Sequence, residues 1–180
     1  MANARFNAHW GIPLKIVSLI GSAICVGVSG LCFFSMSQTP IPKFMPALVA
    51  GIPLSILLIA AFFTVRSYQI SANTLFIHRP GWATRVRLDQ LLSVEHDPLA
   101  MKGSIRIFGN GGLFSFSGSF RNRKLGSYRA FVTDVKNAVV IKLTSGVFVV
   151  SPDSPGQFVD AVKALTTDRS FMNPGIIDRK

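Results

Sequence analysis

The sequence predicts a membrane-anchored α+β protein, in which a two-helix transmembrane hairpin precedes a bent β-sheet or barrel of about seven strands with a C-terminal helix. Three observations support this fold class. Two long runs near the N-terminus carry no charged residue, the chain after Arg66 alternates over short stretches, and one amphipathic stretch lies near the C-terminus. Long uncharged runs are typical of membrane helices, whereas short alternation is typical of strands.

Charge is distributed unevenly along the 180 residues, of which 49% are hydrophobic and 15% are charged. Lys43 is the single charged residue between positions 16 and 65. The whole chain has 19 Lys and Arg against 8 Asp and Glu, so the part after the anchor is strongly basic. A basic domain beside a membrane suits an anionic leaflet, an acidic partner or nucleic acid, and its charge alone does not choose among them.

The two apolar runs are long enough to span a bilayer. They extend from Ile16 to Thr39 and from Phe44 to Val65. Each has the roughly 20 residues that a helix needs to cross about 30 Å of hydrocarbon, so we expect helices over 15–37 and 44–65 within a hairpin at 15–67. A secretory signal peptide is the competing interpretation of the first run, but the apolar stretch is too long for one.

Pro40 and Pro42 separate the two runs and indicate a tight connection. This connection carries only Lys43, whereas several cations flank the outer ends of the hairpin. The flanking cations are Arg5, Lys15, Arg66, Arg79, Arg85 and Arg87. Because cations concentrate on the cytoplasmic side of membrane helices, we expect a multi-pass protein with both termini cytoplasmic, including the N-terminal segment 1–14.

Small side chains recur along both predicted helices at spacings of three and four. Such spacing lets helix backbones approach closely in lipid. The predicted helix-packing residues are Ser18, Ser22, Cys25, Ser29, Ala47, Gly51 and Ser55. A polar path across the membrane is the alternative, but neither run contains the ionisable residue that transport usually needs. Formation of an oligomer through the same helix faces stays open.

Short alternating stretches separated by turn residues predict strands after Arg66. The apolar residues change parity at Asn73, which tolerates left-handed backbone, so we expect a turn or bulge there. Pro80-Gly81 and Gly109-Asn110-Gly111-Gly112 predict further turns. Thr144-Ser145-Gly146 joins two strongly apolar stretches and predicts a hairpin.

A helical pattern replaces the alternation at residues 154–166. Ser154 can cap the helix and Pro155 suits its first turn. The apolar residues recur at helical spacing, at Phe158, Ala161, Val162 and Leu165. Because only one face is apolar, we expect this helix to close the open end of the sheet, which defines a domain over 68–166. The segment 167–180 has no sustained periodicity, and we expect a flexible tail.

Six short stretches carry a family resemblance. They are Tyr68-x-Ile70, Asn73-x-Leu75-x-Ile77, Val86-x-Leu88-x-x-Leu91, Arg121-Asn122-Arg123-Lys124-Leu125-Gly126, Phe131-Val132-Thr133-Asp134 and Val149-Val150-Ser151-Pro152. In this order they resemble the bacterial pleckstrin-homology (PH)-like domain family, whose seven-stranded domain ends in a helix and often follows membrane-spanning helices. The resemblance implies a ligand- or protein-binding module in the cell inner membrane, at its cytoplasmic face.

Two basic clusters supply the candidate binding residues. The first consists of Arg79, Trp82, Arg85 and Arg87, and the second of Arg121, Arg123, Lys124 and Arg129. A turn at Asn73 would bring the first cluster back towards the bilayer, where an indole is well placed. We expect the lipid bilayer as partner, with anionic lipid headgroups or an acidic protein as the ligand of these clusters, and solvated surfaces as the alternative.

Phosphoinositides and nucleic acid are the disfavoured ligands. Eukaryotic PH domains bind phosphoinositides through basic residues around their first hairpin turn, and Arg79, Arg85 and Arg87 only approximate that arrangement because the first position is Arg and the loop is short. Nucleic acid is disfavoured because aromatic side chains do not alternate with the basic ones as a stacking platform.

No constellation for catalysis, a cofactor or a metal is evident in the sequence. The stretch Gly109–Gly112 lacks the Lys-Ser/Thr of a phosphate loop. The adjacent residues Glu95, His96 and Asp97 point in different directions on a strand and have no second ligand cluster. The resulting hypothesis is a non-enzymatic binding or assembly module. The alternative is an accessory subunit of a membrane complex that acts through its transmembrane hairpin.

Overall fold

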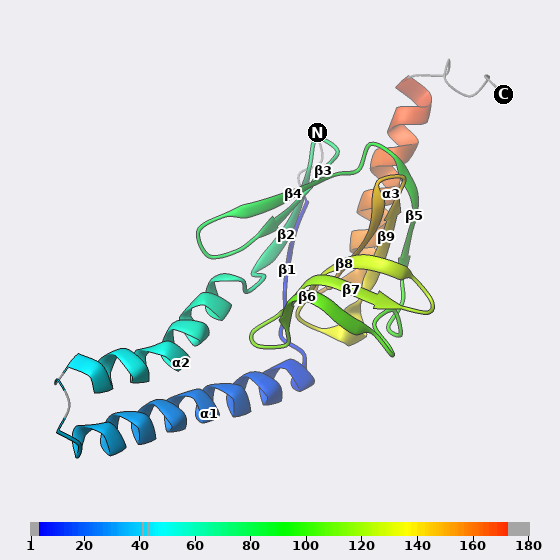
Figure 1. Ribbon diagram of the computed structural model, residues 1–180. Coiled ribbons are helices and arrows are strands. Elements are labelled where there is room, and N and C mark those ends of the chain that lie inside the picture. The colour runs from blue at the N-terminus through cyan, green and yellow to red at the C-terminus, as the bar shows by residue number, and fades with distance from the viewer. Residues whose placement is uncertain (1–3, 41, 43, 173–180) are drawn as a thin grey trace.

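The computed structural model describes the backbone of residues 4–40, 42 and 44–172 (Figure 1). Helices α1 and α2 project together from one side of a β domain, and α3 lies on the opposite side (Figure 1). The elements in chain order are β1 (Ala4–Asn7), α1 (Ile12–Ser37), α2 (Phe44–Phe62), β2 (Ser67–Ser71), β3 (Thr74–His78), β4 (Ala83–Arg87), β5 (Leu91–His96), β6 (Ile105–Gly111), β7 (Phe116–Asn122), β8 (Gly126–Val132), the short 3₁₀ helix η1 (Val135–Asn137), β9 (Val139–Leu143), β10 (Gly146–Val150) and α3 (Pro155–Met172).

Helices α1 and α2 form the expected hairpin. They contain 26 and 19 residues, which correspond to about 39 and 28 Å at 1.5 Å per residue. Only 11% of the most apolar stretch of each helix is buried within the protein, so these helices are not the core of a soluble fold. Their length and exposed apolar surface make them the membrane anchor.

The helix ends differ from the predicted ones. Helix α1 begins at Ile12 because Pro13 fits its first turn. Helix α2 ends at Phe62, three residues early, because Val65 is fully buried in the core of the β domain. The chain therefore leaves the anchor and enters the domain almost at once.

The predicted packing face of α1 is the least exposed part of that helix. Its members are buried or partly buried, at Ser18, Ser22, Cys25 and Ser29.

The predicted packing face of α2 is wrong by one position. Ala47 and Ser55 are exposed and Gly51 is partly buried, whereas Pro46 and Ala50 are buried. Helix α2 is apolar on all sides, so its sequence does not distinguish one face from the next.

The ten strands in the described residues form two sheets. The first has the order β1-β2-β3-β4 and the second the order β5-β9-β10-β8-β7-β6. Neighbouring strands are antiparallel except β8 and β10, which are parallel. The predicted bent sheet with a closing helix is confirmed, with more strands than expected.

Strand β1 lies in the N-terminal segment that was expected to stand outside the domain. It pairs with β2 from Ala4 opposite Ile70 to Asn7 opposite Ser67. Hydrogen bonds continue this attachment up to α1: the N–H of Ala8 donates to the carbonyl of Arg66 and the N–H of Gly11 to that of Thr133, both at 3.0 Å. Four residues are too few for periodicity to reveal a strand.

The turn at Asn73 is confirmed. Ala72 and Asn73 have φ values of 44° and 63° and join β2 to β3 as a two-residue hairpin. The β9–β10 hairpin at Thr144-Ser145 is also confirmed.

The turn predicted at Gly109–Gly112 lies further on, between β6 and β7. Strand β6 continues to Gly111, and Gly109 pairs with Gly118 of β7. A Cβ on Gly109 would lie 2.3 Å from the carbonyl oxygen of Ser117, so this glycine permits close strand approach rather than a turn.

Helix α3 closes the core on the side away from the anchor. Phe158, Val159 and Val162 join a buried cluster that contains residues of both sheets. The helix continues to Met172, so residues 167–172, expected in a flexible tail, are helical. The rest of that expected tail, 173–180, lies outside the described residues.

The core under α3 is filled and hydrogen-bonded. The Phe158 ring meets those of Phe6 and Tyr68 at centroid distances of 5.2 and 6.4 Å. The Tyr68 hydroxyl donates to the carbonyl of Phe131 at 2.6 Å and accepts from the N–H of Ser151 at 3.1 Å. Burial, only partly offset by the hydrogen bonds from Ser151, raises the pKa of Tyr68 to about 12.

Candidate binding site

A cavity of about 700 Å³ lies where the end of α2 meets both sheets, and we call it the arginine cavity. Its lining residues are Ile56, Ile59, Ala60, Phe63, Arg79, Thr84, Arg106, Phe108, Gly109, Asn110, Leu113, Ser117, Gly118, Ser119, Arg129 and Phe131. The last turns of α2 supply an apolar wall, and three strands of the second sheet supply a mixed wall. No carboxylate is among the described residues that line it.

Strand register builds the mixed wall. Two cross-strand rows of β6, β7 and β8 face the cavity: Phe108, Ser119 and Arg129 in one, and Asn110, Ser117 and Phe131 in the next. Hydroxyl, amide and guanidinium groups therefore alternate with aromatic rings on one surface. Such a surface offers several hydrogen-bond donors and few negative charges.

Arg79 lies at the centre of this arrangement. It follows β3, and its N–H donates to the carbonyl of Trp82 at 2.9 Å, which holds the β3–β4 turn. Its Nη2 donates to the Ser117 hydroxyl at 2.8 Å. Three aromatic rings, of Phe63, Trp82 and Phe131, have centroids 5.6, 5.8 and 5.1 Å from its Cζ.

The electrostatics of Arg79 are unusual for an arginine. Its Nε is buried and has no hydrogen-bond partner in the described part of the chain. Burial lowers the pKa of its guanidinium, and nearby Tyr68 opposes that shift. The guanidinium of an arginine stays protonated at neutral pH even when burial lowers its pKa. The site therefore holds a desolvated positive charge that aromatic rings stabilise but no carboxylate neutralises.

Arg106 and Arg129 complete the cationic side. Arg106 Nη1 donates to the carbonyl of Gly109 at 3.2 Å, and Arg129 stands beside Ser119 on the next strand. Arg106 was not predicted as a site residue. The alternation of Ile105 and Ile107 places Arg106 on a strand, but pairing of that strand with β7 and β8 depends on contacts far along the chain.

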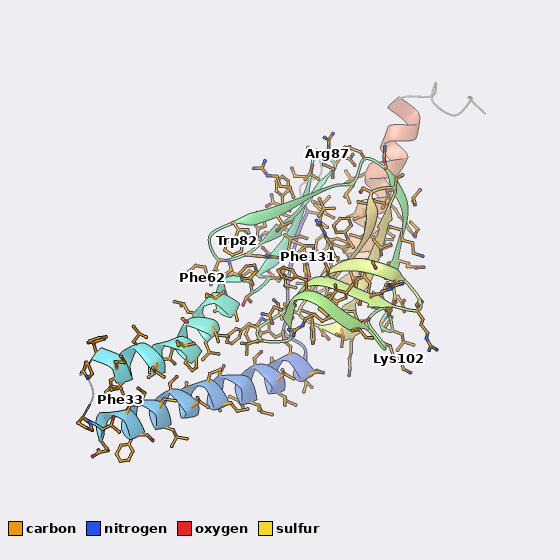
Figure 2. All side chains as sticks on the ribbon, in the orientation of Figure 1. Phe33, Phe62, Trp82, Arg87, Lys102 and Phe131 are labelled. Atoms are coloured by element: carbon orange, nitrogen blue, oxygen red, sulfur yellow. The ribbon has the colours of Figure 1, made fainter. Side chains whose placement is uncertain are left out.

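Trp82 lies beside the end of the anchor. Its ring meets Phe63, just after α2, at 5.3 Å in an edge-to-face contact, and Figure 2 shows it beside Phe62 at the end of the anchor. The β3–β4 loop therefore lies at the end of the anchor, and its contact with the bilayer stays a prediction.

The other predicted binding residues lie outside the arginine cavity. Arg85 projects from the outward face of β4 over the Phe76 ring, at 5.8 Å. Arg87, at the far end of β4 in Figure 2, pairs with Asp89 at 2.7 Å. Lys124 pairs with Asp97, and Arg121 and Arg123 are exposed on β7 and in the turn after it. The cavity thus takes one arginine from each predicted cluster.

The three adjacent residues considered for a metal have other partners. Glu95 pairs with Lys142 at 3.6 Å, and His96 Nε2 lies 3.2 Å from the carbonyl of Lys136. Burial favours the neutral form of Asp97, but hydrogen bonds from Lys124 and the Leu99 N–H outweigh it, so the pKa of Asp97 is lowered.

The β6–β7 turn fastens the cavity to both helices of the anchor. The Ser18 hydroxyl of α1 accepts from the N–H of Phe114 at 2.9 Å. The Ser115 hydroxyl donates to the carbonyl of Phe63, after α2, at 3.1 Å. Leu113, which directly precedes Phe114 and Ser115, lines the cavity. Ser18 therefore binds the β domain as well as lying on the buried face of α1.

Two sheets closed by a C-terminal helix, with an anchor of two apolar helices, define a membrane-anchored domain of the PH-like class. Residues 66–166 match the family described as Bacterial PH domain, and this match covers more than half of the chain. The chain therefore belongs to the Bacterial PH domain family, as the resemblance indicated. No curated protein and no solved structure matches it. PH domains are generally non-catalytic binding modules.

Proposed function

We propose that this protein is a non-enzymatic binding module that holds an anionic group in the arginine cavity, at the cytoplasmic face of the inner membrane. The observation that carries this proposal is Arg79, a half-buried cation that has, among the described residues, no partner for its Nε and no carboxylate beside it. A desolvated, unpaired charge costs folding free energy. An anionic ligand would supply the missing partner.

The donors around the cavity suit a phosphate or a carboxylate. Guanidinium groups bind both through paired N–H donors, and such charge-assisted hydrogen bonds are stronger than neutral ones. Arg79, Arg106 and Arg129 supply the charge, and the hydroxyls of Ser117 and Ser119 add neutral donors. This combination supports recognition of an anion more than of a neutral ligand.

Cation placement supports the proposed orientation. Arg66 follows α2 and the basic β domain follows it, whereas the connection between the helices carries only Lys43. Both termini are then cytoplasmic. Green fluorescent protein fused to the C-terminus should fluoresce, and alkaline phosphatase fused there should be inactive. The reverse pattern would overturn the orientation.

Ligand-induced stabilisation tests the binding function. Full-length protein in neutral detergent would be heated with inorganic phosphate, or with short-chain phosphatidylglycerol, against chloride at equal ionic strength. A ligand that binds only the folded state raises the unfolding midpoint. We expect at least one probe to raise it, and Arg79→Gln to weaken the apparent affinity about tenfold, the loss of about 1.4 kcal/mol.

The matched control is Arg85→Gln, which removes the same charge from the outward face of the neighbouring strand. It should leave the midpoint shift unchanged. If neither probe shifts the wild-type midpoint, or if both variants lose the shift equally, the arginine cavity is not the binding site.

A further inference from the structure

The arginine cavity has a transmembrane helix as one of its walls. Ile56, Ile59 and Ala60 belong to the last two turns of α2. Ile56 and Ile59 are 53% and 58% exposed, as expected for residues that meet hydrocarbon. From Ile56 to the helix end at Phe62 the rise is about 9 Å, so this wall is formed by one end of a helix that is long and apolar enough to cross a membrane.

The opposite wall is also apolar at the membrane side. Leu113 reaches α1, since a Cβ built on Gly21 would lie 3.0 Å from its Cδ1. Phe108 on the edge strand β6 lines the cavity and is 80% exposed. An apolar chain beside α2 would cover this surface. A small soluble anion would leave it in contact with water.

The polar side of the cavity carries only positive charge. Arg79, Arg106 and Arg129 line it, and the carboxylates of the ion pairs found in the described residues lie elsewhere. A zwitterionic headgroup would bring an ammonium group among these arginines with no carboxylate in the described lining to pair with it. A headgroup with net negative charge avoids this repulsion.

Trp82 marks the boundary between the two sides. Its indole contacts Phe63 at the end of α2 and lies 5.8 Å from Arg79. Indoles favour the membrane interface, which supports a position of Arg79 near the lipid headgroups. The cavity therefore combines an acyl-facing wall with cationic groups at the level of lipid phosphates.

We infer that the arginine cavity captures one anionic phospholipid directly from the cytoplasmic leaflet, with its phosphate at Arg79 and Arg129 and its acyl chains along α2. This inference rests on the proposed function and names the ligand class. A volume of about 700 Å³ is that of a site for a drug-sized ligand, so it holds the headgroup and the first part of the chains while the rest stays in the bilayer.

Native mass spectrometry of the full-length protein tests the inference. The protein would be released from nanodiscs with equal amounts of phosphatidylglycerol and phosphatidylethanolamine, and the retained lipids counted by headgroup. We expect one phosphatidylglycerol on the wild-type protein and its loss in the Arg79→Gln/Arg129→Gln variant. The control Arg85→Gln/Arg87→Gln has the same net charge and should keep the lipid.

A variant of the apolar wall separates a lipid from a soluble anion. Ile59→Trp should fill the space beside α2, abolish lipid retention and leave stabilisation by inorganic phosphate intact. Equal retention of the two headgroups, or equal loss of lipid in both double variants, would overturn the lipid inference.

The two proposals fail differently. If phosphate stabilises the wild-type protein as well as short-chain phosphatidylglycerol does and no lipid is retained, the ligand is a soluble anion and the binding function stands. If neither probe stabilises it and no lipid is retained, both proposals fall.

Discussion

The interior between the two sheets is packed differently on the side of α3 and on the side of α2. Under α3, Phe158 is fully buried and the Tyr68 hydroxyl both donates and accepts a hydrogen bond. Beside α2, a cavity remains and the Nε of Arg79 has no partner among the described residues. The end under α3, which we call the closed end, is thus filled with packed side chains, whereas the end beside α2, the open end, contains a cavity. Unsatisfied polar groups in an otherwise well-packed domain are expected where a ligand binds.

The largest loss of stability should follow from removal of a buried side chain at the closed end. Phe158→Ala removes a fully buried ring that contacts Phe6 and Tyr68, and we expect it to lower the unfolding free energy by about 3–5 kcal/mol. Hydrogen exchange of the full-length protein in detergent measures this free energy from the slowest β-domain amides. A loss below about 1 kcal/mol would show that α3 does not seal the core.

The next effect concerns the hydroxyl at the closed end. Tyr68→Phe leaves the Phe131 carbonyl and the Ser151 N–H without their partner, at an expected cost of about 1–3 kcal/mol. Hydrogen exchange again measures the difference. An unchanged stability would mean that water replaces the hydroxyl.

The same tyrosine predicts a pH dependence. Its pKa in the folded protein, about 12, lies above the ordinary value of 10.0, so folding favours the neutral phenol. This contribution is fully present below pH 10 and is lost as the pH rises towards 12. Thermal unfolding from pH 8 to 11 should show a steeper alkaline decline for the wild-type protein than for Tyr68→Phe. Parallel declines would contradict the assignment.

A smaller effect is expected at the attachment of the open end. Ser18→Ala deprives the Phe114 N–H of its acceptor, and we expect a loss of about 1 kcal/mol confined to the β6–β7 turn. Amide exchange at Phe114 should accelerate about fivefold. Ser37→Ala, which removes a hydroxyl bonded only within its own helix, is the control and should not change that rate.

The smallest effect on stability should come from Arg79 itself. Arg79→Met replaces a half-buried cation with an apolar chain, and we expect the unfolding free energy to change by less than about 1 kcal/mol while anion binding is weakened. A cost of about 3 kcal/mol or more would make Arg79 a structural residue and would remove the distinction between the two ends.

Local signals in the sequence predicted much of the fold. Two uncharged runs identified the anchor, Asn73 marked a hairpin, and Ser154-Pro155 marked the start of α3. Each of these patterns determines the structure of residues close to it in the sequence. The failures are of another kind: Gly109 was interpreted as a turn residue because its real neighbour, Gly118, lies on another strand.

The candidate site was predicted only in part for the same reason. Of the eight residues predicted in two basic clusters, only Arg79 and Arg129 line the cavity, and Arg106 was missed. What unites them is the register of β6, β7 and β8 and the position of α2. Basic character is visible in the sequence, whereas the absence of a carboxylate beside each arginine appears only once the strands are paired.

The attachment of the β domain through β1 and β2 has a mechanical consequence. These paired strands lead into the two helices through residues 8–11 and 63–66, and Ala8 is bonded to Arg66 across the gap. A domain that is joined to its anchor by one flexible linker samples many orientations. A domain that is joined by two short, hydrogen-bonded connections cannot rotate freely relative to the anchor. The cavity mouth therefore keeps a constant orientation relative to α1 and α2, and tilting of these helices would turn the whole domain with them.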